Sequence, residues 1–278
     1  MISLSLKKIA FITNGKLCGI DLLINEIIID TNKIIPGCLF IALIGKKFDA
    51  HIFINEAIKK GCSAFITQKD IKSYVSYIIV ENTSIALGQI AGWIRNKTNA
   101  KILAITGSCG KTSVKEMTAS ILKKNGNTIS TINNLNNNIG VPITVLQLTK
   151  KHKYAVIELG ASNPGEISYT SNIIQPEIIL INNIHCAHLK GFKSLLGVSK
   201  AKSEIFSGLK PNGTVVINLD SHHLSQWKKY IKKNNILYFS IKKKNIVIFF
   251  PATLKFMHMA HLLQCIHHLE KQIFHYHF

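Results

Sequence analysis

The hydrophobic pattern of the first hundred residues predicts a small α/β unit. Apolar runs of strand length occur three times, at 36–43, 63–67 and 77–80. Helical spacing of apolar residues occurs twice, at 50–61 and 83–97. A polar stretch at 96–101 then fits a linker. We therefore expect a first domain over residues 1–98.

A different pattern begins at Lys101. Its strands are continuous apolar runs rather than alternating ones, which is typical of parallel strands covered by helices on both faces. These runs are separated by helical segments and lie at 102–106, 154–159, 177–182 and 214–218. The alternation predicts a doubly wound α/β nucleotide-binding domain over residues 99–245.

The segment 106–113, "TGSCGKTS", follows the first of these strands and leads into a helix. It ends like a phosphate-binding loop, but Ile105 stands where the usual G-x-x-x-x-G-K-[ST] pattern has its first glycine. The loop is either a shorter phosphate cradle or a chance match. Because a strand, a loop and a helix come in the order that a cradle needs, we favour nucleotide binding.

Within this loop, individual residues have candidate roles. Main-chain N–H groups at the helix N-terminus would point at phosphate oxygens, Lys111 would neutralise the β- and γ-phosphates, and the Thr112 hydroxyl would reach Mg²⁺. We interpret Cys109 as a spacer rather than a nucleophile. The candidate nucleotide-binding residues are Gly107, Ser108, Cys109, Gly110, Lys111, Thr112 and Ser113.

Two polar residues lie near the ends of the following strands. Glu158 falls in the last part of 154–159, at the edge where parallel sheets bind ligands, and its carboxylate suits Mg²⁺. His188 follows the strand at 177–182 on the same edge. Taken singly, they would be a solvated acid and a structural histidine. Their shared edge with Thr112 makes both candidate metal ligands.

Composition and charge change this picture little. The 278-residue chain carries a formal net charge of +20, which indicates either an anionic partner or a coding bias towards lysine. We favour the bias, because the lysines are scattered and no aromatic-studded basic groove for nucleic acid is visible. The cysteines are irregularly spaced, which predicts a reduced protein. The sequence has neither a signal-peptide pattern nor an apolar run of membrane length, so we expect a cytoplasmic protein without membrane insertion.

The chain resembles the Mur ligases of peptidoglycan synthesis in five segments, which come in the family's order and spacing: "GSCGKTSVKEMTASIL", "NLNNNIGVPITVLQL", "VIELGASNPGEI", "NNIHCAHLKGF" and "VSKAKSEIFSGL". This family uses a shortened G-x-x-G-K-[ST] loop. A sixth segment, "IDTNKIIPGCLFIALIGKKFDAHIF", is similar to the family's UDP-sugar-binding segment. The resemblance is strongest to the branch that adds D-alanyl-D-alanine to UDP-N-acetylmuramoyl-tripeptide.

The resemblance implies a reaction and a set of catalytic residues. ATP would phosphorylate the terminal carboxylate of the UDP-muramoyl-tripeptide, and the amine of D-alanyl-D-alanine would displace phosphate to form an amide. Lys111, Lys202 and His188 would be catalytic. Lys202, as a carbamate, would join Thr112, Glu158 and His188 around Mg²⁺.

Further site residues are also implied by the resemblance. Lys200 and Lys202 lie ~200° apart on a helix, so only one can face the site, and the family pattern selects Lys202. Asn137 and Asn138 match an Asn-rich turn near the bound nucleotide and substrate. The residues expected to bind the UDP-sugar are Asp30, Thr31, Phe48, Asp49 and His51.

The C-terminal segment departs from this pattern. The resemblance fades near Asn245, no segment matches the family's third domain, and the tail 246–278 holds six of the twelve histidines without a compact metal-binding spacing. Two interpretations stay open. One is a working ligase, alone or with a second chain; the other is a non-catalytic remnant that binds nucleotide and UDP-sugar only. We expect a monomer that binds ATP and UDP-muramoyl-tripeptide weakly and ligates poorly or not at all alone.

Overall fold

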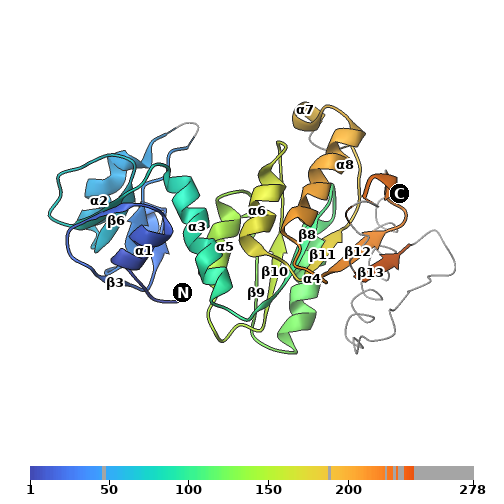
Figure 1. The fold of residues 1–278 in the computed structure, drawn as a ribbon, viewed down its shortest axis with the longest axis horizontal. Helices are drawn as coiled ribbons and strands as arrows, with labels where there is room; N and C mark the ends of the chain where they lie inside the picture. The colour runs from blue at the N-terminus through green and yellow to red at the C-terminus, as the bar shows by residue number, and fades with distance from the viewer. Residues whose placement is uncertain (46–47, 187–188, 223, 228–229, 231–234, 241–278) are drawn as a thin grey trace. The chain divides into compact units, whose positions relative to one another are not determined.

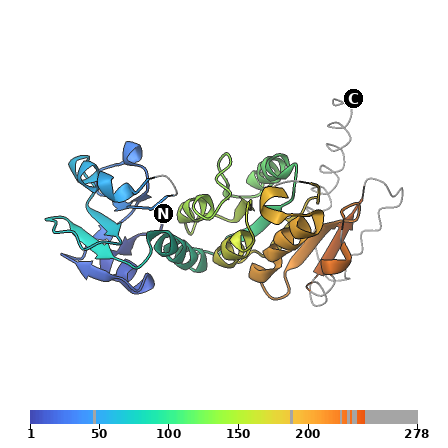
Figure 2. The same ribbon diagram turned by 90° about the horizontal axis from the view of Figure 1, so that it is seen from above.

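A computed structural model describes residues 1–45, 48–186, 189–222, 224–227, 230 and 235–240. These residues divide into two compact units, Met1–Asn99 with Val145–Lys150, and Ala100–Thr144 with the chain from Lys151 onward. The path of each unit can be followed by colour in Figures 1 and 2, where residues 1–99 run from blue to blue-green. The histidine-rich tail 246–278 lies outside the described residues.

The first unit is a small α/β domain. Its elements are β1 (Leu4–Ser5), α1 (Leu6–Ile12), β2 (Lys16–Cys18), β3 (Leu23–Ile24), β4 (Ile27–Ile28), η1 (Thr31–Lys33), β5 (Leu39–Ile41), η2 (Ala50–Phe53), α2 (Ile54–Lys59), β6 (Ala64–Thr67), β7 (Ser76–Ile79) and α3 (Thr83–Asn96). The three predicted strands are present as β5, β6 and β7. The segment 50–61 begins as a 3₁₀ turn before it becomes α2.

The main sheet of this unit has the order β2-β7-β6-β5-β4. All neighbouring strands are parallel except β2, which pairs with β7 in the antiparallel sense. One face of the sheet is packed by Phe40, Phe65 and Tyr77, one from each of three adjacent strands, against Ala57 of α2. The rings of Phe65 and Tyr77 stack with centroids 5.2 Å apart, so aromatic contacts hold the middle of this core.

The second unit contains the alternating strands and helices that the sequence predicts. Its elements are β8 (Lys101–Thr106), α4 (Lys111–Lys123), β9 (Thr128–Ser130), α5 (Gly140–Leu146) up to Thr144, β10 (Tyr154–Glu158), α6 (Glu166–Ile174), β11 (Ile178–Ile181), α7 (Leu189–Phe192), α8 (Leu195–Ser203), η3 (Glu204–Gly208), β12 (Thr214–Asn218), η4 (Leu224–Trp227) and β13 (Asn235–Phe239). The short strands β9 and β13 are additions to the predicted set.

The strands of this unit form one parallel sheet of order β13-β12-β11-β8-β10-β9. The chain leaves β8, builds β9 and β10 on one side of it, and then continues with β11 on the other side. The strand order therefore reverses at β8, between its neighbours β10 and β11. In open α/β sheets, ligands bind beyond the carboxyl ends of the strands at such a reversal.

Burial on both faces explains the continuous apolar runs of these strands. On one face, Leu103, Val156 and Leu180 pack with Val114 of α4. Residues of the opposite parity, such as Ala104 and Ile157, are also fully buried. The α/β, doubly wound architecture predicted from the sequence is thus confirmed. Within the described part of the chain, no helix is long and apolar enough to cross a membrane.

Candidate nucleotide-binding and active site

The loop between β8 and α4 has the backbone of a phosphate-binding turn. Gly107 has φ +155° and Gly110 has φ +73°, and Gly110 precedes the thirteen-residue helix α4 without a side-chain cap. The first turn of that helix contains no acidic residue, so its N–H groups and the positive end of its dipole are available to an anion. The Lys111 ammonium lies over the loop and donates a 3.0 Å hydrogen bond to the Gly107 carbonyl.

Two asparagines beyond β11 hold this loop in place. The Cys109 carbonyl accepts hydrogen bonds from Nδ2 of Asn182 at 3.0 Å and of Asn183 at 3.1 Å. Asn183 also accepts, through its Oδ1, the N–H of Cys109 at 2.9 Å and, through its carbonyl, the N–H of Ser108 at 3.0 Å. The N–H groups of Ser108 and Cys109 are therefore used inside the protein. The N–H groups that remain for a phosphate are those of the residues after Cys109, at the start of α4.

Sequence reasoning did not select these two asparagines. The signal for them is the pair "NN" directly after an apolar strand, a place where side-chain amides can reach the neighbouring loop. Their contacts also explain why glycine is required nearby. A Cβ on Gly110 would lie 3.0 Å from Asn182 Nδ2, and one on Gly107 would lie 3.0 Å from Asn182 Cβ.

Glu158, the last residue of β10, meets the start of α4. Its Oε2 accepts a 2.9 Å hydrogen bond from the Thr112 hydroxyl, and its Oε1 accepts a 2.7 Å hydrogen bond from Asn136 Nδ2. Its own N–H donates to the Thr131 hydroxyl at 2.9 Å. The side chain is almost completely covered, because Glu158 is only 2% exposed. Thr112 and Glu158 therefore lie together at the carboxyl edge of the sheet.

This pair has the donor chemistry that Mg²⁺ requires. A hydroxyl and a carboxylate are hard oxygen ligands, and Mg²⁺ in nucleotide sites is commonly held by one or two protein oxygens, water and the phosphates. Among the described residues, no three His, Cys, Asp or Glu side chains lie together in a way that could hold a metal ion. His188, the other predicted ligand, lies outside the described residues.

Lys202 is buried and lies in the electrostatic environment of the same site. It is 1% exposed, whereas Lys200 on the same helix, α8, is exposed. The pKa of Lys202 is lowered from 10.5 to about 8, chiefly by burial and also by the Lys111 charge, while Glu204, Glu166 and Glu158 oppose this shift.

The two lysines of α8 face in different directions, as the helical geometry predicts. The Lys202 ammonium lies 5.9 Å from the centroid of the Phe192 ring, so its surroundings are partly aromatic. An anion placed between Lys202 and Lys111 would relieve their mutual repulsion.

The asparagines of the Asn-rich turn have different contacts in the structure. Asn137 Oδ1 accepts the N–H groups of Ile139 and Gly140 at 3.1 and 2.8 Å and so caps the start of α5. Asn138 is exposed. The side chain of this turn that contacts Glu158 belongs to Asn136, which the family pattern did not single out. Adjacent asparagines in one turn cannot be ranked from sequence, because their orientation depends on the turn's backbone.

In the first unit, the predicted UDP-sugar residues follow the carboxyl ends of β4 and β5. Asp30 caps η1 through a 3.0 Å bond from the Asn32 N–H, and the Thr31 carbonyl accepts Lys60 Nζ at 3.1 Å. Phe48 is 60% exposed. These residues share one edge of the sheet and leave an aromatic ring free at the surface.

Asp49 and His51 form an internal network on that edge. Asp49 accepts a hydrogen bond from Lys69 Nζ at 2.8 Å and pairs with His51 Nδ1, and these contacts hold the pKa of Asp49 well below its usual range. His51 Nε2 accepts the Gln68 N–H at 2.9 Å. Both ring nitrogens of His51 are therefore hydrogen-bonded within the protein. In this structure the side chain holds Asp49 and the Gln68 main chain together.

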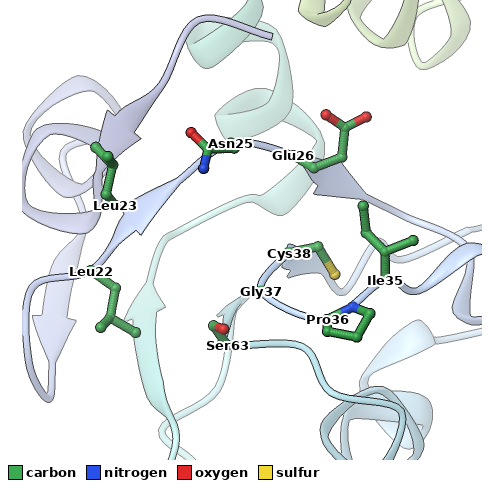
Figure 3. A pocket seen from close by; sticks show the side chains of 9 residues that line it. All are labelled: Leu22, Leu23, Asn25, Glu26, Ile35, Pro36, Gly37, Cys38 and Ser63. Carbon is green, nitrogen blue, oxygen red and sulfur yellow. The ribbon is translucent and has the colours of Figure 1, made fainter.

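A cavity of 260 Å³ in the first unit lies at the opposite edge of the sheet (Figure 3). Its polar lining includes Glu26, Cys38 and Ser63, which directly precede β4, β5 and β6. The five residues predicted to bind UDP-sugar follow the strands rather than precede them, and the cavity is lined by other residues. The cavity is thus separate from the edge that carries the residues predicted to bind UDP-sugar.

The chain matches known proteins over most of its length. Residues 105–272 match the family description Mur ligase middle domain. This match extends past Asn245, into residues that the structure does not describe.

The most similar relatives include two ligases of one name, UDP-N-acetylmuramoyl-tripeptide–D-alanyl-D-alanine ligase. The protein from Buchnera aphidicola subsp. Acyrthosiphon pisum is 81% identical over 255 residues, which are 92% of this chain and 56% of that protein. The Escherichia coli protein is 46% identical over 245 residues, covering 88% and 54%. The chain therefore spans about half the length of the curated relatives it matches.

Solved structures agree with these relatives. MurF from Acinetobacter baumannii superposes with a TM-score of 0.82 at 37% identity, covering 85% of this chain and 53% of that one. MurF ligase from Thermotoga maritima, solved in complex with ADP, gives a TM-score of 0.71 at 28% identity over 79% and 51%. The family match covers more than half of the residues and the fold agrees with it, and the chain belongs to the Mur ligase family.

Proposed function

We propose that this chain carries the nucleotide and UDP-sugar sites of an ATP-dependent ligase that joins D-alanyl-D-alanine to UDP-N-acetylmuramoyl-tripeptide. One observation carries the proposal. Thr112 and Glu158 meet at the reversal point of a doubly wound sheet, beside a glycine loop that opens a helix. Family membership and the names of the most similar relatives indicate which reaction this geometry serves.

The β- and γ-phosphates of ATP would be held at the start of α4. The free N–H groups of the first turn would bind phosphate oxygens, and Lys111 would exchange its bond to the Gly107 carbonyl for a bond to phosphate. Thr112 and Glu158 would supply protein oxygens to Mg²⁺. The bound metal ion would neutralise charge on the phosphates.

Lys202 has the properties required for the carbamate that the family resemblance implies. Carbamylation joins a neutral amine to CO₂ and releases one proton. Because burial brings the pKa of Lys202 to about 8, a larger fraction of this amine is neutral near pH 7 than for an exposed lysine. The product is an anion that the Lys111 charge would favour, and its oxygens suit Mg²⁺. Lys202 would then complete the metal environment together with Glu158.

The UDP-sugar would bind at the carboxyl edge of the first unit's sheet. Phe48 offers an exposed ring for stacking, and the caps at Asp30 and Asp49 fix the two turns on either side of it. His51 would act by holding Asp49 and the Gln68 N–H rather than by direct contact. This edge is distinct from the cavity lined by Cys38 and Ser63 (Figure 3).

The reaction can be tested on the whole chain with ATP, Mg²⁺, UDP-N-acetylmuramoyl-tripeptide and D-alanyl-D-alanine. We expect phosphate release that requires both peptide substrates, with the matching pentapeptide product detected by mass spectrometry. The alternative function, substrate binding without catalysis, predicts binding of ATP and the UDP-tripeptide but no dipeptide-dependent phosphate. That second result would contradict ligase activity for this chain while leaving the binding sites in place.

A further inference from the structure

Helix α4 contains a second lysine, Lys115, which is completely buried and has no role in the proposed reaction. Lys115 is 0% exposed and lies one helical turn after Lys111, on the same side of the helix. An ammonium group removed from water is costly unless acceptors replace the water. Its partners therefore indicate what this charge does.

The ammonium of Lys115 has acceptors for its three N–H groups. Nζ donates to the Thr131 carbonyl at 2.7 Å, lies 2.8 Å from Glu116 Oε1, and reaches the Asn133 carbonyl at 3.5 Å. Asn133 has φ +49°, in the left-handed region that residues other than glycine seldom adopt. The Lys115 ammonium thus anchors the main chain just after β9, including Asn133 with its unfavourable left-handed backbone.

The segment anchored in this way holds Glu158. Thr131 accepts the Glu158 N–H through its hydroxyl at 2.9 Å, and Asn136 donates to Glu158 Oε1 at 2.7 Å. The Asn136 carbonyl also accepts the Gly160 N–H at 2.9 Å, so the segment is tied to both sides of the end of β10. The Lys115 ammonium is therefore connected through the main chain of residues 131–136 to the Glu158 N–H, at Thr131, and to the Glu158 carboxylate, at Asn136.

We propose that Lys115 is a positioning residue for the Mg²⁺–nucleotide site. It acts by fixing residues 131–136 so that Asn136 and Thr131 orient the Glu158 carboxylate. The inference rests on the proposed function, because it takes Glu158 as a metal ligand. Lys115 itself contacts carbonyls and Glu116 rather than a ligand position. Outer partners of metal ligands typically change metal affinity roughly 10- to 100-fold when they are removed.

The test compares nucleotide binding with and without Mg²⁺. Binding of the non-hydrolysable analogue adenylyl imidodiphosphate is measured by calorimetry in excess Mg²⁺ and in EDTA, for wild type, Lys115→Met and Lys123→Met. Lys123 is an exposed lysine of the same helix and serves as the matched control. We expect Lys115→Met to lose roughly 10- to 100-fold in the gain that Mg²⁺ gives, with unchanged binding in EDTA. Lys123→Met should behave as wild type.

Each other outcome overturns the inference or the proposed function. An unchanged Mg²⁺ gain in folded Lys115→Met overturns the positioning role, and so does an equal loss of binding in EDTA, because that is general damage to the site. If Lys115→Met does not fold, Lys115→Gln gives the same comparison, and unfolding of both variants would show a role in overall stability instead. If wild type itself shows no Mg²⁺-dependent binding, the proposed function fails first.

Discussion

The hydroxyl of Thr112 donates a 2.9 Å hydrogen bond to Oε2 of Glu158 and so joins the first turn of α4 to the end of β10. The two residues belong to different strand–helix units, and only the parallel register of β8 and β10 brings them together. Asn136 donates to the other oxygen of the same carboxylate at 2.7 Å. Several consequences of the arrangement can be measured.

Removing the hydroxyl should weaken both the fold and the metal site. In Thr112→Val, the buried Glu158 carboxylate loses one of its two side-chain donors, so we expect the free energy of unfolding to fall by about 1–2 kcal/mol. Mg²⁺-dependent nucleotide binding should fall as well. Chemical denaturation and calorimetry measure the two effects, and Ser120→Ala, at an exposed position of α4, should change neither. Full Mg²⁺-dependent binding by Thr112→Val would argue against the role of this hydroxyl.

The buried ammonium of Lys202 should make stability depend on pH. Its pKa falls from 10.5 in the unfolded chain to about 8 in the fold, so the unfolded state binds more protons between these values. The contribution of Lys202 to the free energy of unfolding therefore rises as pH increases from about 8 to 10.5.

A neutral replacement of Lys202 isolates that contribution. Lys202→Met should abolish the rise and should stabilise the protein at pH 7 by on the order of 3 kcal/mol. The exposed Lys200→Met is the control. Equal pH dependence in wild type and Lys202→Met, measured by denaturant unfolding across pH 7–10.5, would contradict the burial of a charged amine.

The left-handed turn at Gly110 should not accept a side chain. Alanine there must adopt φ near +73° and place its Cβ 3.0 Å from Asn182 Nδ2. We expect Gly110→Ala to cost about 1–2 kcal/mol and to impair nucleotide binding, measured by thermal unfolding and calorimetry. In contrast, Gly92→Ala, in α3 with no atom within 4 Å of the added Cβ, should stabilise by about 0.5–1 kcal/mol. Equal effects of the two substitutions would refute the special backbone of the loop.

Bound nucleotide should protect Cys109 from alkylation. This thiol is exposed in the phosphate loop, whereas Cys38 and Cys62 are buried. Burial also raises the pKa of both buried thiols, so they should stay unreactive throughout. Labelling with N-ethylmaleimide, followed by peptide mass spectrometry, should show slower modification of Cys109 in Mg²⁺–ATP. An unchanged rate at Cys109 would place the nucleotide elsewhere.

The fold was largely predictable because the strands of the second unit are buried on both faces. Continuous runs such as 102–106 and 214–218 have no other common explanation in a chain that alternates with helices. The elements that the pattern missed are short or lie at sheet edges. β3 and β4 contain two residues each, and β9 is half-exposed, so they offer too few positions for a periodic signal.

The candidate site was predictable only where a motif fixes the role of a residue. Lys111, Thr112 and Glu158 follow from a loop and a strand end. Asn136 and Lys115 do not, because an asparagine in a polar turn and a lysine in an amphipathic helix are ordinarily solvated. Their roles depend on contacts between segments that are far apart in sequence, and such contacts exist only in the folded chain.

We propose that Thr112 and Glu158 form a Mg²⁺–ATP site, and this site can be tested by equilibrium binding of ATP. Titration of the whole chain with ATP, in excess Mg²⁺ and in EDTA, should show tighter binding with the metal for wild type. Glu158→Gln keeps the size of the side chain but removes its charge, and it should lose most of that difference while still binding ATP in EDTA. The same Mg²⁺ dependence in Glu158→Gln as in wild type would contradict the account.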